Sequence, residues 1–431
     1  IYPEQFLSVM LAIAFPAVYL AVPAGEGRFR QGSVPWYDVL AAIAGFSAAA
    51  FSAVKFPQLT ELTTLRPIEG LISGGVIVVL LVEGARRTVG RAFTIVVVVF
   101  IAFALGGHLI PGMLQGRPVS FEKLIYYSAW DSTAILGVST RVVTTIVVAF
   151  VLFGKLLFSA GGSAFFTDIS SAVMGRYRGG PAKISVLASS LFGSISGSVV
   201  SNIVSTGVIT IPLMRKGGYK AEHAGAIESV ASCGGQLMPP VMGTAAFVMA
   251  EFLGVNYGEV VVAALIPAVL FYVALFIQAD LEAVRSGIDR IDEADIPKVG
   301  PVLKSGWQFP LPFAVLMVAL FVWNYSPETS AICAAATVVL TGVVFGFEGK
   351  RLTPRKILDT LRDTGLNVLN IIMIGGAAGL VIGVLNISGL GFGLTLALVQ
   401  VASGHLLFLL VLSAIVCIIL GMGMPTLGVY I

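Results

Sequence analysis

The sequence is poor in charge. Only 11% of the 431 residues are Asp, Glu, Lys or Arg, whereas soluble domains carry about 25%. Hydrophobic residues make up 57% of the chain, and apolar runs long enough to cross a bilayer, roughly 17–25 residues each, recur along its whole length. These proportions exclude an ordinary globular protein and predict an all-α polytopic membrane protein.

Cysteine and catalytic motifs are also scarce. The three cysteines, Cys233, Cys333 and Cys417, are scattered in apolar stretches, which excludes a disulfide framework and a cysteine metal site. No HExxH, GxSxG, Walker A or dinucleotide glycine pattern occurs. The sequence therefore predicts neither an enzyme nor an ATPase, and no cofactor.

Nine unbroken apolar segments are candidate membrane spans. They are residues 5–22, 37–54, 70–86, 92–110, 142–163, 258–279, 309–324, 329–347 and 364–386. The chain begins at Ile1 rather than Met and ends inside an apolar segment, so we expect both ends to be truncated.

Lysine and arginine orient these spans, because positive residues accumulate in cytoplasmic loops. If loop 23–36 is cytoplasmic, twenty of the 26 cations lie on that face, in the clusters 28–30, 86–91, 176–183, 215–220, 285–304 and 350–362. The opposite face receives five, Lys55, Arg66, Arg117, Lys123 and Arg141, and Lys155 lies inside a span. This asymmetry predicts that loop 23–36 and the six clusters face the cytoplasm.

Segment 184–214 carries positive clusters at both ends. A single crossing would place one cluster outside, and the segment is too long for one span. Two half-helices that enter and leave on the cytoplasmic side satisfy both constraints. The sequence therefore predicts a re-entrant hairpin whose tip lies at Ser194–Ser198, a run of residues that weaken a helix.

Segment 222–254 is interrupted by Gly234-Gly235 and by Pro239-Pro240. Adjacent prolines remove backbone donors and force a helix apart. Unwound backbone at membrane depth persists only where it is buried in protein or lines a polar cavity. The sequence thus predicts a broken helix beside the hairpin tip.

The same pattern recurs near the end of the chain. Gly180 and Gly197 are 17 residues apart, as are Gly404 and Gly421. No Lys or Arg occurs from 386 to 431, as expected for a second hairpin that enters from the outer face. Inverted repeats with broken helices mark the binding sites of transporters. We therefore expect a secondary transporter.

The hydroxyl and amide side chains of the first hairpin tip have two interpretations. They could be packing contacts between membrane helices, or ligands of a hard cation such as Na⁺. Glu222 and Glu228 open the broken helix, where a helix N-terminus favours carboxylates as solvated caps. Glu228 is deep enough in the segment to be a candidate for proton coupling. The sequence leaves coupling to Na⁺ or to H⁺ open.

From about residue 34 onward the chain resembles the fused permeases of tripartite ATP-independent periplasmic (TRAP) transporters, in particular the subgroup paired with TAXI-type binding proteins. The motifs that carry the resemblance are V34PWYD38, G84ARRTVG90, R178GGPAK183, S194ISGSVVSN202, I211PLMRKGGY219, G234GQLMPPVMGTAAFVMAEFLG254 and G421MGMPT426.

The resemblance implies two domains: a small membrane scaffold domain over residues 1–116, truncated at its N-terminus, and a large permease domain over 117–431, truncated at its C-terminus. It implies an elevator-type fold in a bacterial or archaeal inner membrane. A periplasmic TAXI-type binding protein would deliver a small carboxylate or amino acid, and Na⁺ would drive its import. No nucleic acid is implied.

The resemblance also implies two sites for the cation and substrate. The first would comprise Ser194, Ser196, Gly197, Ser198, Asn202, Gly235, Gln236, Pro239, Pro240, Gly243 and Thr244. The second would comprise Gly421, Gly423, Met424 and Thr426. Leu427 stands where a second threonine is expected, so one ligand of the second site is in question. A passive facilitator, a channel or a stand-alone carboxylate carrier are the alternatives.

Overall fold

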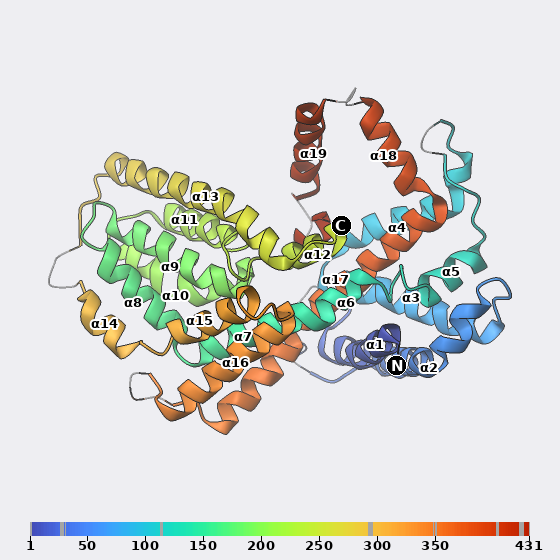
Figure 1. Cartoon of the computed structure of the whole chain (residues 1–431), viewed down its shortest axis with the longest axis horizontal. Coiled ribbons are helices and arrows are strands. Elements are labelled where there is room, and N and C mark those ends of the chain that lie inside the picture. Colours follow the sequence, from blue (N-terminus) through green and yellow to red (C-terminus); the bar gives the residue numbers. More distant parts are fainter. Residues whose placement is uncertain are drawn as a thin grey trace. The chain divides into compact units, whose positions relative to one another are not determined.

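The computed structural model describes residues 2–25, 30, 32–112, 115–291, 296–347, 349, 351–401, 405–421 and 426–430 (Figure 1). Its described elements are helices, as predicted, and they form two compact units: Ile1–Thr144 with Leu366–Ile431, and Thr145–Gly365.

Among the described residues, eight helices are long and apolar enough to cross a membrane. A ninth span results if Val299–Ser305 and Pro310–Phe321 are counted together, although they meet at 69°. The eight spans overlap eight of the nine predicted segments. The ninth, 309–324, was predicted as one unbroken span and instead contains the 12-residue helix Pro310–Phe321. Segments 184–214 and 222–254 are not among the spans, as expected for a hairpin and a broken helix.

The first unit begins with four long helices. Its elements are α1 Pro3–Ala21, α2 Trp36–Leu59, η1 Thr60–Leu62, α3 Ile68–Thr88, α4 Arg91–Gly106, η2 Gly107–Leu109, α5 Phe121–Trp130, α6 Val138–Val142, the later part of α17 Pro354–Ser388, α18 Leu390–Val401, α19 Leu406–Gly421 and α20 Thr426–Tyr430. Small residues let its helices pack closely. A Cβ added at Gly45 would lie 2.7 Å from Cβ of Phe15, and one at Gly84 would lie 2.7 Å from Sδ of Met373.

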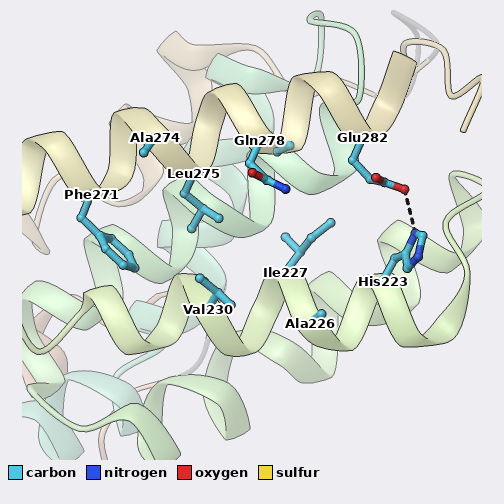
Figure 2. Close-up of a pocket in the computed structure, with 10 residues that line it drawn as sticks. His223, Ala226, Ile227, Val230, Phe271, Ala274, Leu275, Gln278 and Glu282 are labelled. Atoms are coloured by element: carbon cyan, nitrogen blue, oxygen red, sulfur yellow. Dashed lines mark ion pairs between the residues drawn. The ribbon is translucent and has the colours of Figure 1, made fainter. Parts of the chain in front are cut away.

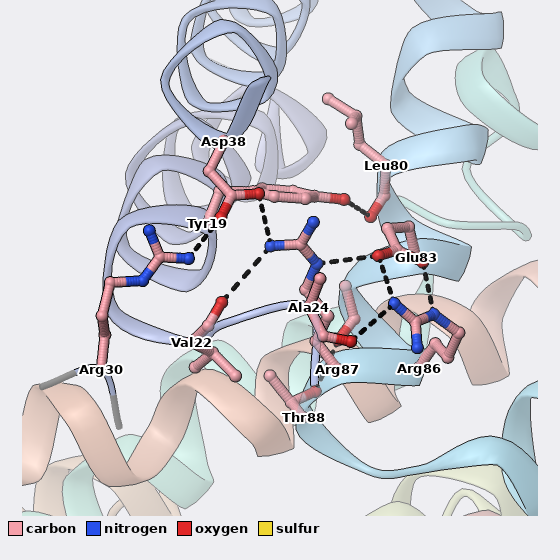
Figure 3. Close-up of polar contacts among 11 residues, drawn as sticks. Tyr19, Val22, Ala24, Arg30, Asp38, Leu80, Glu83, Arg86, Arg87 and Thr88 are labelled. Atoms are coloured by element: carbon pink, nitrogen blue, oxygen red, sulfur yellow. Dashed lines mark hydrogen bonds and ion pairs between the residues drawn. The ribbon is translucent and has the colours of Figure 1, made fainter. Parts of the chain in front are cut away.

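Charged side chains join α1, α2 and α3 at one end of this bundle (Figure 3). Asp38, fully buried, accepts from Arg87 at 2.7 Å and also from Arg30. Arg87 also donates to Glu83 at 2.8 Å, and Glu83 receives two further bonds from Arg86 at 2.6 and 2.7 Å. We call these five residues the scaffold ion network. Its three cations fall in two of the predicted cytoplasmic clusters.

The second unit contains the first hairpin. Its elements are the π-helical turn η3 Val143–Val147, which straddles the unit boundary, and α7 Val148–Ser159, α8 Gly162–Met174, α9 Gly180–Ser196, α10 Val199–Lys216, α11 Ala221–Gly234, α12 Thr244–Leu253, α13 Tyr257–Arg285, α14 Val299–Ser305, α15 Pro310–Phe321, α16 Pro327–Val344 and the first part of α17. Helices α9 and α10 pack against each other and both contact α8 and α11 (Figure 1).

The order and lengths of the elements repeat along the chain. The 13-residue α8 and 17-residue α9 precede the first tip, and the 12-residue α18 is followed by the 16-residue α19, which ends at Gly421. The inverted orientation of the second copy stays a prediction. Gly404, the counterpart of Gly180 in the predicted repeat, lies outside the described residues.

Candidate functional site

Glycine builds the hairpin tip. Helix α9 ends at Gly197, whose φ of +56° lies in the left-handed region that glycine adopts without strain. A Cβ at this position would lie only 1.9 Å from the carbonyl oxygen of Met242. Ser198 then caps α10, because its Oγ accepts from the N–H of Ser201 at 3.4 Å. The turn thus lies at Gly197 and Ser198, the last two residues of the predicted tip, while Ser194–Ser196 still belong to α9.

The open ends of the hairpin lie together. A Cβ added at Gly217, directly after α10, would lie 2.6 Å from Cγ of Pro181 in the first turn of α9. Tyr219 packs there with Ala182 of α9, Ala224 of α11 and Ala283 of α13. The two positive clusters that predicted the hairpin thus flank one end of it.

The broken helix docks on the tip. Residues 235–243, between α11 and α12, are not helical. The N–H of Val241 in this segment donates to the carbonyl of Ser194 at 3.1 Å, and the N–H of Gly243 donates to the carbonyl of Gln236 at 2.8 Å. The hydroxyl of Tyr257, at the start of α13, donates to the carbonyl of Pro240 at 2.9 Å. The sequence predicted this break.

Glycines also set how closely the two elements approach. A Cβ added at Gly193 of α9 would lie 2.4 Å from Cα of Gly235, and one at Gly235 would lie 2.6 Å from Cα of Gly193. The backbones of hairpin and broken helix are therefore in direct contact beside Asn202, whose Nδ2 would lie 3.1 Å from the Gly193 Cβ.

The residues predicted for the first site do come together, around this contact. Fully buried Asn202 donates from Nδ2 to the carbonyl of Ser189 at 2.9 Å. Ser194 donates to the carbonyl of Leu191 at 2.8 Å, and Ser196 to that of Ser198 at 3.5 Å. The other members surround the break: Gly235, Gln236, Pro239, Pro240 and Gly243 lie in it and Thr244 opens α12.

Of the second predicted site, only two residues are described. Gly421 is the last residue of α19 and Thr426 the first of α20. Gly423 and Met424 lie outside the described residues.

The second unit holds a buried carboxylate, Glu228 on α11, which is fully shielded from solvent. Its Oε2 accepts from Ser185 at 2.6 Å and Thr210 at 2.5 Å. Its Oε1 accepts from Thr206 at 2.5 Å, Ser189 at 3.1 Å and Ser232 at 3.3 Å. We call Glu228 and these five hydroxyls the carboxylate box.

Glu228 is therefore not a solvated cap, whereas Glu222 in the first turn of α11 is exposed, as a cap would be. The sequence predicted that Glu228 lies deep in its segment but did not predict the hydroxyls around it. A signal was present: Ser185 and Ser189, Thr206 and Thr210, and Glu228 and Ser232 are each four residues apart, so each pair shares one helix face.

A mainly apolar cavity of about 430 Å³ lies between α11 and α13 (Figure 2). Ile227 and Val230 face Phe271 and Leu275 across it, and Figure 2 shows His223 and Glu282 closing one end with an ion pair of 2.8 Å. Its lining predicts affinity for an apolar chain rather than for a small carboxylate.

The comparison with known proteins agrees with this architecture. The model of the DctM component of tripartite ATP-independent periplasmic transporters matches residues 76–431. The sialic acid TRAP transporter permease protein SiaT of Haemophilus influenzae is 26% identical over 257 residues, which are 59% of this chain and 39% of that protein.

Two further relatives have similar identity. The ectoine/5-hydroxyectoine TRAP transporter large permease protein UehC of Ruegeria pomeroyi is 25% identical, over 66% of this chain and 65% of that protein. The C4-dicarboxylate TRAP transporter large permease protein DctM of Rhodobacter capsulatus is 22% identical, over 60% and 64% respectively. The match thus spans between 39% and 65% of the length of these three relatives. With the family model matching most of its length, the chain belongs to the DctM component family of tripartite ATP-independent periplasmic transporters.

Proposed function

We propose that the chain is part of the membrane permease of a binding-protein-dependent secondary transporter that imports a small organic acid or amino acid with a cation. The observation that carries the proposal is the docking of the broken helix on the hairpin tip, through the hydrogen bond from Val241 to Ser194. Freed backbone groups of two interrupted elements meet there, and such breaks are where transporters bind substrates and ions.

Na⁺ is the cation proposed for the tip. Hydroxyl, amide and carbonyl oxygens are ligands for hard cations. The tip concentrates them around Ser194, Ser196 and Asn202. A bound ion would stiffen the tip against segment 235–243. The substrate site would then form only with the ion in place.

Three further elements of the proposal come from the resemblance. A TAXI-type periplasmic binding protein delivers the substrate, residues 1–116 form a fused small scaffold domain, and the hairpins move by an elevator mechanism in the inner membrane. The relatives support the general class, since their names include permeases for sialic acid, ectoines and C4-dicarboxylates.

The proposal is tested with the full-length protein in liposomes, with the binding protein added to one set. We expect accumulation of a labelled carboxylate against its gradient only when an inward Na⁺ gradient and the binding protein are both present. Uptake that stops at equal concentrations would identify a facilitator or channel. Saturable accumulation without the binding protein would identify a stand-alone carrier.

The tip assignment has its own test, the substitution Ser196→Ala. Loss of one oxygen from a small ion cage should raise the Na⁺ concentration for half-maximal uptake about tenfold, or about 1.4 kcal/mol of ion binding. Ser229→Ala on α11, where the exposed hydroxyl only bonds the carbonyl of Gly225, is the matched control. An unchanged Na⁺ dependence in Ser196→Ala would make the tip serine a packing residue.

A further inference from the structure

No cation pairs with Glu228 of the carboxylate box within the described part of the chain. The nearest basic side chains along α9 and α11 are engaged elsewhere: Lys183 pairs with Asp280 at 2.6 Å and His223 with Glu282 at 2.8 Å. None of the ion pairs among the described residues includes Glu228. A buried, unpaired carboxylate costs several kcal/mol unless it takes up a proton or a cation. Ionisable groups at membrane depth accordingly mark ion or proton pathways.

The hydroxyls of the box can serve either charge state of Glu228. Thr206 Oγ1 lies 2.9 Å from the carbonyl of Asn202 as well as 2.5 Å from Glu228, and Thr210 Oγ1 lies 3.0 Å from the carbonyl of Thr206. A hydroxyl rotates about its C–O bond and can donate or accept. An ionised Glu228 can therefore receive several bonds. A protonated Glu228 can instead donate to a threonine that turns to its own backbone, and no donor is left unpaired.

The hydrogen bonds fit a proton better than a metal ion. Ser185, Thr206 and Thr210 each have a hydroxyl oxygen within hydrogen-bond distance of Glu228. Oxygens that ligate one metal ion turn lone pairs toward it and do not donate to one another. The contacts would have to open before a metal could enter.

The box also joins moving parts of the proposed mechanism. Its donors come from both arms of the hairpin, α9 and α10, while Glu228 belongs to α11, which leads into the segment docked on the tip. Among the described residues, the other titratable group near it is Tyr272 of α13, whose hydroxyl donates to the carbonyl of Ala231 at 3.0 Å and which is not a cation. A change of charge at Glu228 therefore acts directly on how α11 holds the hairpin.

We propose that Glu228 is a proton-carrying site, separate from the cation site at the tip, which binds one proton between the hairpin arms and α11 and releases it during transport. In this step the carboxylate gains a proton from water on one side of the membrane and returns it on the other, and no other bond changes. The carrying role rests on the proposed function, whereas the protonation itself does not.

The protonation is tested by infrared spectroscopy of the full-length protein in lipid, titrated from pH 4 to pH 10. We expect a protonated-carboxyl C=O band that Glu228→Gln removes and the exposed-site control Glu222→Gln leaves in place. Thr210→Val removes a donor to the ionised form, so the half-point of this band should move up by about one pH unit. Since Thr210→Val keeps the carboxyl, it also reports on the site if Glu228→Gln does not fold. A titration identical in Glu228→Gln and the parent protein overturns the proposal, as does a half-point unchanged in Thr210→Val.

The carrying role is tested in liposomes with the binding protein, using a pH gradient at fixed Na⁺ and clamped membrane potential. We expect the pH gradient to raise uptake several-fold in the parent and in the exposed-site control Glu222→Gln, and to have no effect on uptake by Glu228→Gln. Equal stimulation in both proteins overturns the carrying role. If the parent shows no uptake under any gradient, the proposed function fails, and the infrared titration still decides whether Glu228 binds a proton.

Discussion

Gly197 shows how a single residue determines the geometry of the tip. Two conditions must be met there. The backbone is left-handed, with φ of +56°, and the carbonyl oxygen of Met242 lies 1.9 Å from where a Cβ would be. A side chain could meet the first condition with strain of about 1–2 kcal/mol. It could meet the second only if segment 235–243 moved away from the hairpin.

Gly197→Ala should therefore cost markedly more than backbone strain alone. Gly254 is the matched control, because its φ is +64° and a Cβ there would have no neighbour within 4 Å. We expect Gly254→Ala to lower the free energy of unfolding by about 1 kcal/mol. Gly197→Ala should lower it by at least twice as much and abolish uptake. Thermal unfolding in detergent and liposome uptake measure both effects, and equal losses in the two variants would mean that the contact with Met242 does not constrain the tip.

At the scale of elements, the scaffold ion network fixes α1, α2 and α3 to one another. Asp38 is buried and accepts hydrogen bonds from both Arg87 and Arg30, while Arg87 also donates to the carbonyl of Val22 after α1 at 3.3 Å. Removing one partner from a buried charge network leaves the others uncompensated, which typically costs about 3–5 kcal/mol.

Asp38→Ala is therefore expected to destabilise the first unit by about 3–5 kcal/mol, seen as a large fall in the thermal unfolding midpoint. The control is Glu122→Gln, which removes the more exposed pair of Glu122 with Arg66 at 3.8 Å. Such pairs contribute about 0–1 kcal/mol. If Asp38→Ala unfolded at the same temperature as Glu122→Gln, the network would not hold these helices together.

The elements themselves could largely be predicted from the sequence. Hydropathy located the spans because lipid demands unbroken apolar helices, and the prolines at 239 and 240 located the break because they remove backbone donors. The 69° bend between α14 and α15 and the π-helical turn Val143–Val147 were not predicted. They depend on packing between segments, which hydropathy does not record.

Only part of the candidate site could be predicted from the sequence, for a similar reason. Residues that weaken a helix are adjacent in the sequence, so the tip at Gly197 could be predicted from the sequence. The carboxylate box draws on three helices, and its hydroxyls meet Glu228 only after α9 and α10 have folded back on α11. In the sequence of a single helix, a row of hydroxyl residues indicates only packing, because nothing in that helix shows which residues its polar face will contact.

At the scale of the whole molecule, the distribution of charge predicts how the chain lies in the membrane. Twenty cations on one face against five on the other would place both ends of the first hairpin in the cytoplasm. The two ends do lie together, because the residue after α10, Gly217, packs against Pro181 at the start of α9. Arg178 and Lys216, which flank the hairpin, are both exposed.

Single cysteines at Arg178 and Lys216 should therefore react with a membrane-impermeant maleimide from the cytoplasmic side only. The background needs all three native cysteines replaced, since Cys233 and Cys417 are exposed and Cys333 is half-buried. Lys123→Cys is the control for the other face, because Lys123 is exposed and belongs to the set predicted outside. It should react from the periplasmic side only. Labelling of positions 178 and 216 from opposite faces would show that the α9–α10 segment crosses the membrane. The predicted inverted repeat, and the cation site placed at its tip, would then both be wrong.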